Sequence, residues 1–457
     1  MPSAPSPARL PGTVSGDVTP AATPPVTYGL LFRLAAPAAA SAVLNNAFRV
    51  IDQYAAGAIG TSAQAAIGSC TFVLIAAWAV YALVSGGAGP LMARATGAGD
   101  MALRRRVFGA SLTGSALLGV GLGALVLVGA PAIAAGLGLK GEVAADAVVF
   151  LRTLALGGIP LAVHPLLDAF FVAIGRPGVM MALQVAAAVL NALLNPLFIH
   201  TFDLGIAGTG IATCLSRALT VGIGIYVLVR EFRPTWADFA LGDTILRVMR
   251  IGAPITINTL LYAGVYAALL RTTISPLGPQ VNAALGIGFS ALEGLTYPMF
   301  LGVSLGVSSL VGRQLGAGRP EEARRAARLG FPMATGLGLA AGALFWFGAE
   351  PLCAPFTRDP VVLAAAITYA RILALTQVCV AWEALAEGVL AGAGATRAIF
   401  WISAPINLLR VPLGFVLAFE LGWGAAGVWW AINLTSVLKA LAKGIVAARG
   451  QWTKQVV

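Results

Sequence analysis

Four polar residues interrupt strongly apolar stretches of the chain at positions where they could share one site. Asp52 lies near the end of the first stretch, Asn191 and Asn195 lie in the fifth, and Thr213 opens the sixth. At 1.5 Å per helical residue, all four fall roughly 7–14 Å below the same membrane surface. A carboxylate with amide and hydroxyl oxygens can hold a hard cation or a proton. We predict a cation-coupling site, with Na⁺ at Asp52 as the one candidate metal.

A structural role is the alternative for the same residues. Arg49 lies three residues before Asp52 and could neutralise it as an ion pair on the helix surface. The two asparagines could serve as hydrogen-bonding contacts between helices. In that case the four residues would stabilise the bundle without coupling any ion.

A second group of candidates comes from an internal repeat. At an offset of 219 residues, His164 and Asp168 fall on Glu383 and Glu387, and both pairs are spaced to lie on one helix face. Charges inside a membrane are costly and commonly functional, so we predict these residues and Glu293 as substrate or proton-relay candidates. Alternatively, His164 is a packing residue and the acids pair with arginines predicted within spans: Arg217, Arg271 and Arg410.

The repeat extends along the whole apolar part of the chain. The segment R-A-T-G-A-G at 94–99 recurs as R-Q-L-G-A-G at 313–318, and the segment at 151–156 recurs at 370–375. We expect the glycines of the R-x-x-G-A-G segments to form tight turns, and the arginines to lie at the cytoplasmic face. Two copies of a long apolar unit are typical of a transporter whose substrate path lies between the halves.

Composition excludes a water-soluble class. Of 457 residues, 58% are hydrophobic and 10% are charged, against about 25% charged in an ordinary soluble domain. The net charge of +11 lies in short loops, where it sets membrane orientation, so we expect no nucleic-acid partner. We find no P-loop, zinc motif or activated nucleophile, and predict no enzyme activity and no cofactor. The expected partners are small organic substrates and the lipid bilayer, with no obligate protein partner implied.

The predicted fold class is an all-α integral membrane protein with twelve transmembrane helices in two parallel six-helix repeats. The expected domains are a disordered tail (1–26), an N-lobe (27–230), a cytoplasmic linker (231–246), a C-lobe (247–447) and a C-terminal tail (448–457). Basic residues in alternate loops predict that both termini are cytoplasmic. The expected spans are 28–57, 63–93, 107–130, 143–174, 178–200, 205–230, 247–275, 283–311, 329–349, 362–392, 398–420 and 424–447.

Several motifs together resemble the multidrug and toxic compound extrusion (MATE) family. They are the two R-x-x-G-A-G segments, V-I-D at 50–52, L-N-A-L-L-N-P-L-F at 190–198 and G-I-A-G-T-G-I-A-T at 205–213. The resemblance implies a secondary antiporter of the bacterial cytoplasmic membrane. Such a protein exports organic, often cationic and amphipathic, compounds in exchange for H⁺ or Na⁺ by alternating access of two lobes.

The resemblance also bears on the candidate site. Asp52, Asn191, Asn195 and Thr213 match a cation site in the N-terminal lobe of one branch of the family. The branch often has Asp where this chain has Asn195, so one carboxylate remains instead of two. Other proteins share features of the plan: a lipid-linked oligosaccharide flippase, a major facilitator transporter, or a membrane scaffold without transport.

Overall fold

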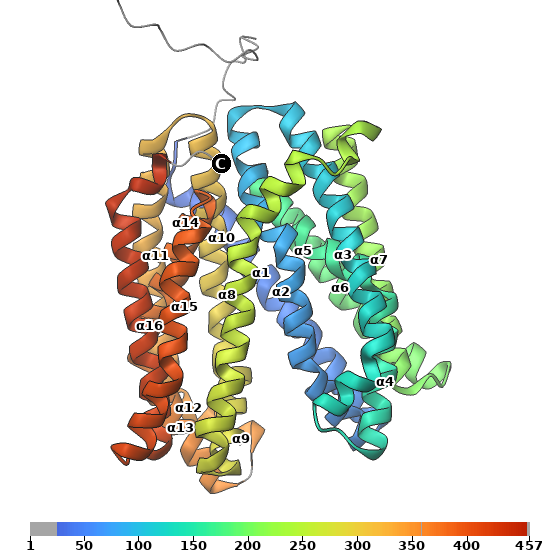
Figure 1. The fold of residues 1–457 in the computed structure, drawn as a ribbon, viewed down its shortest axis with the longest axis vertical. Coiled ribbons are helices and arrows are strands. Elements are labelled where there is room, and N and C mark those ends of the chain that lie inside the picture. Colours follow the sequence, from blue (N-terminus) through green and yellow to red (C-terminus); the bar gives the residue numbers. More distant parts are fainter. Residues whose placement is uncertain (1–24, 358, 455–457) are drawn as a thin grey trace, which may run out of the picture.

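The computed structural model describes residues 25–357 and 359–454, and this part of the chain is almost entirely helical (Figure 1). The predicted disordered tail lies outside the described residues except for its last two positions. The N-terminal half contains seven α-helices and a short π-helical turn after the sixth. Their bounds are α1 Tyr28–Ile59, α2 Thr61–Ala98, α3 Met101–Gly136, α4 Gly141–Leu156, α5 Gly158–Ala173, α6 Pro177–Pro196, η1 Leu197–Thr201 and α7 Gly205–Phe232.

The C-terminal half repeats this order with extra short turns. A 3-10 turn, η2 Trp236–Phe239, precedes it. The elements are α8 Asp243–Leu269, η3 Leu270–Ile274, η4 Ser275–Leu277, α9 Pro279–Ile287, η5 Gly288–Glu293, α10 Gly294–Gly316, α11 Pro320–Phe347, α12 Ala349–Cys353, η6 Ala354–Phe356, α13 Pro360–Ala374, α14 Gln377–Gly392, α15 Thr396–Phe415, η7 Val416–Glu420, α16 Gly424–Arg449 and η8 Gln451–Lys454.

Each of the twelve predicted spans coincides with a helix or with consecutive helices. Two spans predicted as continuous, 143–174 and 362–392, are instead bent pairs: α4 and α5 meet at 62°, and α13 and α14 meet at 59°. The first break falls at Gly157, whose added Cβ would lie 2.2 Å from the Cys214 sulfur, so glycine permits close contact with α7. The two bends are repeat-equivalent.

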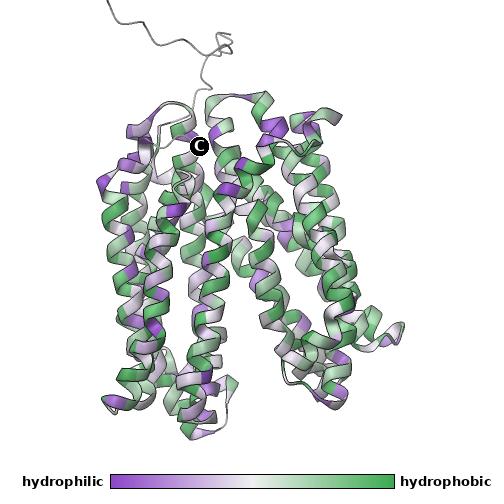
Figure 2. Ribbon diagram, viewed as in Figure 1, coloured by the Kyte–Doolittle hydropathy of each residue, from purple (hydrophilic) through white to green (hydrophobic). Residues whose placement is uncertain are grey.

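The chain is a multi-pass membrane protein. Among the described residues, nine helices are long and apolar enough to cross a membrane, or eleven when each bent pair is taken as one crossing. The helix α1, with 32 residues, is not one of the eleven, so the twelfth crossing stays a prediction there. Figure 2 shows apolar residues along most of the helical surface and polar residues gathered toward the helix ends.

The helices form two groups that meet along a seam (Figure 1). We call α1–α7 the N-lobe and α8–α16 the C-lobe. Across the seam, α1 packs against α10, and α2 packs against α8 and α10. The predicted domain boundaries remain a prediction; within 231–246, η2 packs against α3, and Thr113 donates a hydrogen bond to the Phe239 carbonyl at 3.0 Å.

Glycines bring the two lobes into backbone contact at the seam. A Cβ added to Gly97 would lie 1.8 Å from the Arg313 carbonyl oxygen, and one added to Gly316 would lie 2.0 Å from the Arg94 carbonyl oxygen. Gly97 and Gly316 occupy equivalent positions of the two R-x-x-G-A-G segments. These segments therefore form a near-symmetric contact between the lobes, where the sequence predicted tight turns at the cytoplasmic face.

We expect Gly316→Ala to separate the lobes at this seam. The added methyl group has no space beside the Arg94 carbonyl, and overpacking of this kind costs about 1–3 kcal/mol. The population in which the seam is closed should fall, and a spin-label distance between α3 and α11 should shift to longer values. Gly336→Ala in α11 is the matched control, because an added Cβ there meets no atom within 4 Å. An unchanged distance distribution in Gly316→Ala would contradict the role of this contact.

Candidate cation-coupling site

The structure brings Asp52, Asn191, Asn195 and Thr213 into one buried cluster. The amide nitrogens of Asn191 and Asn195 donate hydrogen bonds to Asp52 Oδ1 at 3.1 and 3.2 Å. The Thr213 hydroxyl donates to Asp52 Oδ2 at 2.8 Å. All four residues are at most 8% exposed. A carboxylate in the first helix is therefore held by donors from two other helices of the N-lobe.

Local sequence explains how these helices present the donors. Asn191 and Asn195 are four residues apart, so they lie on one face of α6. The Asn195 amide nitrogen also lies 3.0 Å from the Asn191 backbone carbonyl oxygen, which fixes its side chain against the helix. Thr213 lies two turns into α7, after the glycine-rich start G-I-A-G-T-G of that helix. Close packing of Gly208 against the backbone at Phe198 and Ile199 holds α7 beside the end of α6.

Hydrogen-bond donors in this cluster all point toward the Asp52 carboxylate. Both asparagines direct their N–H donors at Asp52, and the carbonyl oxygen of Asn195 is buried without a hydrogen-bond donor. Asp52 therefore supplies the one carboxylate that these four residues offer to a cation. The proposed ion pair with Arg49 falls on a side chain outside the described ones, so it is untested.

A second buried cluster in the N-lobe centres on Arg217, one helical turn after Thr213. Its guanidinium donates to the Gln184 amide oxygen at 2.8 Å and lies 2.5 Å from His164 Nε2. It also donates to the Asn45 amide oxygen at 2.7 Å and lies over the Phe48 ring at 4.1 Å. Arg217 thus contacts α1, α5 and α6 at once.

His164 and Asp168 belong to the same cluster. His164 Nδ1 lies 3.7 Å from Asp168 Oδ2, and the Gln184 amide nitrogen donates to the same Asp168 oxygen at 3.2 Å. Sequence reasoning missed Gln184 and Asn45. Gln184 precedes Asn191 and Asn195 by seven and eleven residues, so a common face of α6 was the signal that could have found it.

The repeat-equivalent acids in the C-lobe have different partners. Lys443 lies 3.0 Å from Glu383 and 2.7 Å from Glu387, and Lys439 lies 2.9 Å from Glu383. Both lysines are in α16 and are at most 7% exposed. The arginines considered as alternative partners form no ion pair with these two acids among the described residues. The lysines were missed, although their spacing of four places them on one face of α16.

Glu293 belongs to the same part of the C-lobe as Glu383 and Glu387. Its carboxylate accepts a hydrogen bond from the Tyr369 hydroxyl, and Tyr369 packs edge-on against Trp429. In the described part of the chain, Glu293 makes no ion pair, but Lys439 and Arg410 are close enough to act on it electrostatically. The predicted relay residues therefore fall into one group in the N-lobe and one in the C-lobe.

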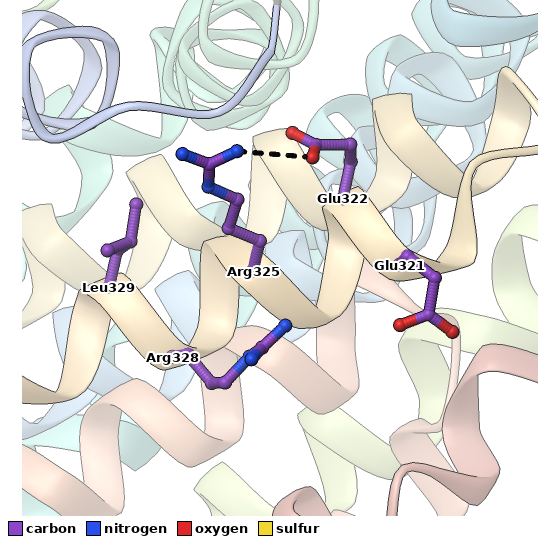
Figure 3. Close-up of a pocket in the computed structure, with 5 residues that line it drawn as sticks. All are labelled: Glu321, Glu322, Arg325, Arg328 and Leu329. Atoms are coloured by element: carbon purple, nitrogen blue, oxygen red, sulfur yellow. Dashed lines mark hydrogen bonds and ion pairs between the residues drawn. The ribbon is translucent and has the colours of Figure 1, made fainter.

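Other parts of the described chain offer no competing metal centre. No group of three or more His, Cys, Asp or Glu side chains that could hold a metal ion occurs among the described residues, and all four cysteines are free. A hollow of about 450 Å³ lies on the first turns of α11 (Figure 3). Two of its charged residues, Arg325 and Glu322, are paired with each other at 3.5 Å, and Glu321 pairs with Arg324 outside the hollow at 2.6 Å.

The fold matches solved structures of membrane transporters. It aligns with the structure described as "Outward-facing conformation of a multidrug resistance MATE family transporter of the MOP superfamily", with a TM-score of 0.87 and 22% identity over 93% of this chain and 96% of the other. A transporter of the MOP superfamily from Pyrococcus furiosus, described as having a binding pocket of reverse polarity, gives a TM-score of 0.86 at 22% identity over the same shares. The chain therefore has the fold of these multi-span, two-lobed membrane proteins.

Sequence comparisons narrow this class to one family. The family model described as MatE matches residues 37–197 and 254–416. A relative in Pseudomonas aeruginosa, named "Probable multidrug resistance protein NorM", is 28% identical over 441 residues, covering 92% of this chain and 88% of the relative. A relative of the same name in Geobacillus kaustophilus is 30% identical over 327 residues, covering 67% and 70%. The chain belongs to the MatE family; it is a transporter and not an enzyme, and the major facilitator alternative is wrong.

Proposed function

We propose that the protein is a secondary antiporter that exports small organic compounds and takes its driving force from cation binding at Asp52. The relatives named as multidrug resistance proteins support the export of drug-like substrates. The contacts of Asp52 support the coupling role. A carboxylate buried among three hydrogen-bond donors in a membrane helix is costly to maintain, and function is the usual reason that such a group is retained.

The coupling ion that these contacts favour is the proton. A hard metal ion is bound by several oxygen atoms, commonly with more than one carboxylate. Here the cluster has one carboxylate, and the two amides present nitrogen to it. A metal ion would need further oxygen ligands, whereas a proton requires only that one donor be displaced from Asp52.

Arg217 keeps the ion-free site close to neutral. This guanidinium is close enough to Asp52 to act on it electrostatically, and it is held there by Asn45, Gln184 and His164. The ionised Asp52 and Arg217 together carry no net charge, and either a proton or a sodium ion bound at Asp52 adds one positive charge. Arg217 therefore favours release of the bound cation, and the choice of the proton rests on the single carboxylate of the cluster.

Other titratable groups lie near the Asp52 cluster. Cys214 in α7 is close enough to Asp52 to act on it electrostatically, and His164 and Asp168 lie behind Arg217. The helix α6, which supplies two of the three donors, contains no titratable residue. Proton exchange in this part of the N-lobe therefore involves Asp52, with Asp168 and His164 as relay candidates.

Alternating access links the cation to the substrate. Proton binding at Asp52 favours one arrangement of the lobes and substrate binding favours the other, because a ligand shifts an equilibrium only by its difference in affinity for the two states. The bacterial cytoplasmic membrane is the proposed location, with both termini in the cytoplasm. Arg94 and Arg313 of the R-x-x-G-A-G segments lie near the ends of α2 and α10. An excess of arginine at the ends of membrane helices is typical of the cytoplasmic side, which supports this orientation.

A lipid-linked oligosaccharide flippase is the second candidate, and Arg410 is the observation that favours it. Arg410 is 1% exposed and donates to Thr435, Tyr266 and Ser436, none of which is acidic. A buried cation whose hydrogen bonds go to hydroxyl groups and not to a carboxylate suits an anionic substrate. The relatives named as multidrug resistance proteins favour export of drug-like compounds over this alternative.

We expect Asp52→Asn to abolish proton-driven efflux of a cationic dye from inverted vesicles. The amide cannot gain or lose a proton at neutral pH, so efflux should fall to the level of empty vesicles. Asn191→Ala, which removes one charge-assisted hydrogen bond, should weaken coupling about tenfold. Asn407→Ala is the matched control, because Asn407 is a buried asparagine of α15 in the C-lobe and its Oδ1 accepts no hydrogen bond. Undiminished efflux in Asp52→Asn would remove Asp52 from the mechanism.

We expect Asn195→Asp to introduce a response to sodium that the wild type lacks. The new carboxylate would face Asp52, add oxygen ligands and compensate the charge of a metal ion. Efflux should be measured under a pH gradient alone and under a Na⁺ gradient at constant pH. Asn407→Asp, which adds a carboxylate to the other lobe, controls for a general effect of charge. Wild-type efflux driven by sodium alone would contradict proton coupling and leave the role of Asp52 intact.

A further inference from the structure

A pocket of about 410 Å³ lies at the end of the molecule where α1 begins and α10 ends, away from the clusters described above. It is bounded by the start of α1, the turn between α5 and α6, and the end of α10. Three arginines line it: Arg33 in α1, Arg176 at the start of α6, and Arg313 in α10. The first two belong to the N-lobe and the third to the C-lobe.

The positive charge of this pocket is only partly compensated. Arg176 lies 2.9 Å from Glu231, but the same carboxylate also lies 3.3 Å from Arg104. Arg33 and Arg313 form no ion pair with any described carboxylate. One acid is therefore shared by two arginines, while the two remaining guanidinium groups have no opposite charge.

Arg313 is the group whose environment most requires an anion. Its guanidinium packs against Gly175, where an added Cβ would lie 2.5 Å from Nη1, and its Nε is buried without a hydrogen-bond acceptor. Gly175 has φ of 79°, a left-handed turn that glycine adopts without strain. A half-buried guanidinium with an unused donor is unfavourable unless an anion accepts from it.

The shape and chemistry of the lining define the ligand. Guanidinium groups match the oxygens of a phosphate group in a planar, bidentate manner. The other side of the pocket is apolar and includes Leu30, Leu34 and Pro37. A ligand with a phosphate and an adjoining apolar portion fits both halves, whereas free inorganic phosphate would leave the apolar half unused.

We propose that this pocket binds the phosphate of an anionic phospholipid headgroup, which bridges the two lobes. Because Arg313 comes from the C-lobe and Arg33 from the N-lobe, a bound headgroup stabilises the arrangement in which the seam is closed. The basic loops place this end of the molecule at the cytoplasmic leaflet, where anionic lipids attract arginines. The R-x-x-G-A-G segment that contains Arg313 thus has a ligand-binding role as well as a packing role.

The test is a titration of short-chain phosphatidylglycerol onto the purified, detergent-solubilised full chain. Phosphatidylcholine and inorganic phosphate are titrated in parallel arms. The wild type should bind phosphatidylglycerol in preference to both. Arg33→Gln should weaken this binding about tenfold, because one charge-assisted contact is lost. Arg328→Gln is the control, since Arg328 is in α11 and lines a different hollow.

Three results would overturn the proposal. The first is equal binding of phosphatidylglycerol to the Arg33→Gln and Arg328→Gln variants. The second is equal binding of phosphatidylcholine and phosphatidylglycerol, because the pocket would then not recognise net negative charge. The third is inorganic phosphate competing as strongly as the lipid, which would assign the pocket to free phosphate. Circular dichroism of Arg33→Gln is the control for folding, and because Arg33 is exposed we expect an unchanged helical spectrum.

Discussion

Burial of the Asp52 charge is the constraint on which the functional part of this molecule depends. A carboxylate in a membrane helix must be supplied with donors or be neutralised, because neither lipid nor apolar side chains can solvate it. Three helices meet this demand together: α1 carries the acid, α6 carries two amides, and α7 carries a hydroxyl. Arg217 then adds an opposite charge one turn further along α7. The positions of α1, α6 and α7 relative to each other are thereby fixed by polar contacts as well as by packing.

The internal repeat preserves the backbone plan and not the chemistry. The bends between α4 and α5 and between α13 and α14 are equivalent, and so are the π-helical turns η1 and η7. The buried polar groups differ between the lobes. Where α5 carries a histidine and an aspartate beside an arginine, α14 carries two glutamates paired with lysines of α16. The buried charges are therefore compensated by different partners in the two lobes. For this reason the two lobes need not respond to the same ion.

The helices and the Asp52 cluster could be predicted from the sequence for physical reasons. Apolar length predicts crossings, and counting residues from the span ends placed Asp52, Asn195 and Thr213 at a common depth. The partners of Glu383 were not predictable in this way, because pairing with Lys443 depends on how α14 and α16 are rotated about their axes. The bend before α14 was also missed, since no proline falls at that break. The ligand pocket at Arg313 required the lobes to be placed side by side, which no local pattern specifies.

The helix α1 connects the Asp52 cluster to the contact between the lobes, and this connection gives a route by which a proton at the proposed site would affect the whole molecule. Its first half packs against the C-lobe: Gly302 and Gly306 of α10 approach Ala39 and Ala35 closely. Its second half carries Asp52, about 20 Å further along at 1.5 Å per residue. Between them, Asn46 donates to the Gly294 carbonyl of α10 at 3.2 Å. Protonation of Asp52 would weaken its contacts with α6 and α7. The contacts that the rest of α1 makes with α10 would stay in place. We infer that α1 then favours the C-lobe over its own lobe, so that a change in charge becomes a change in the relative position of the lobes.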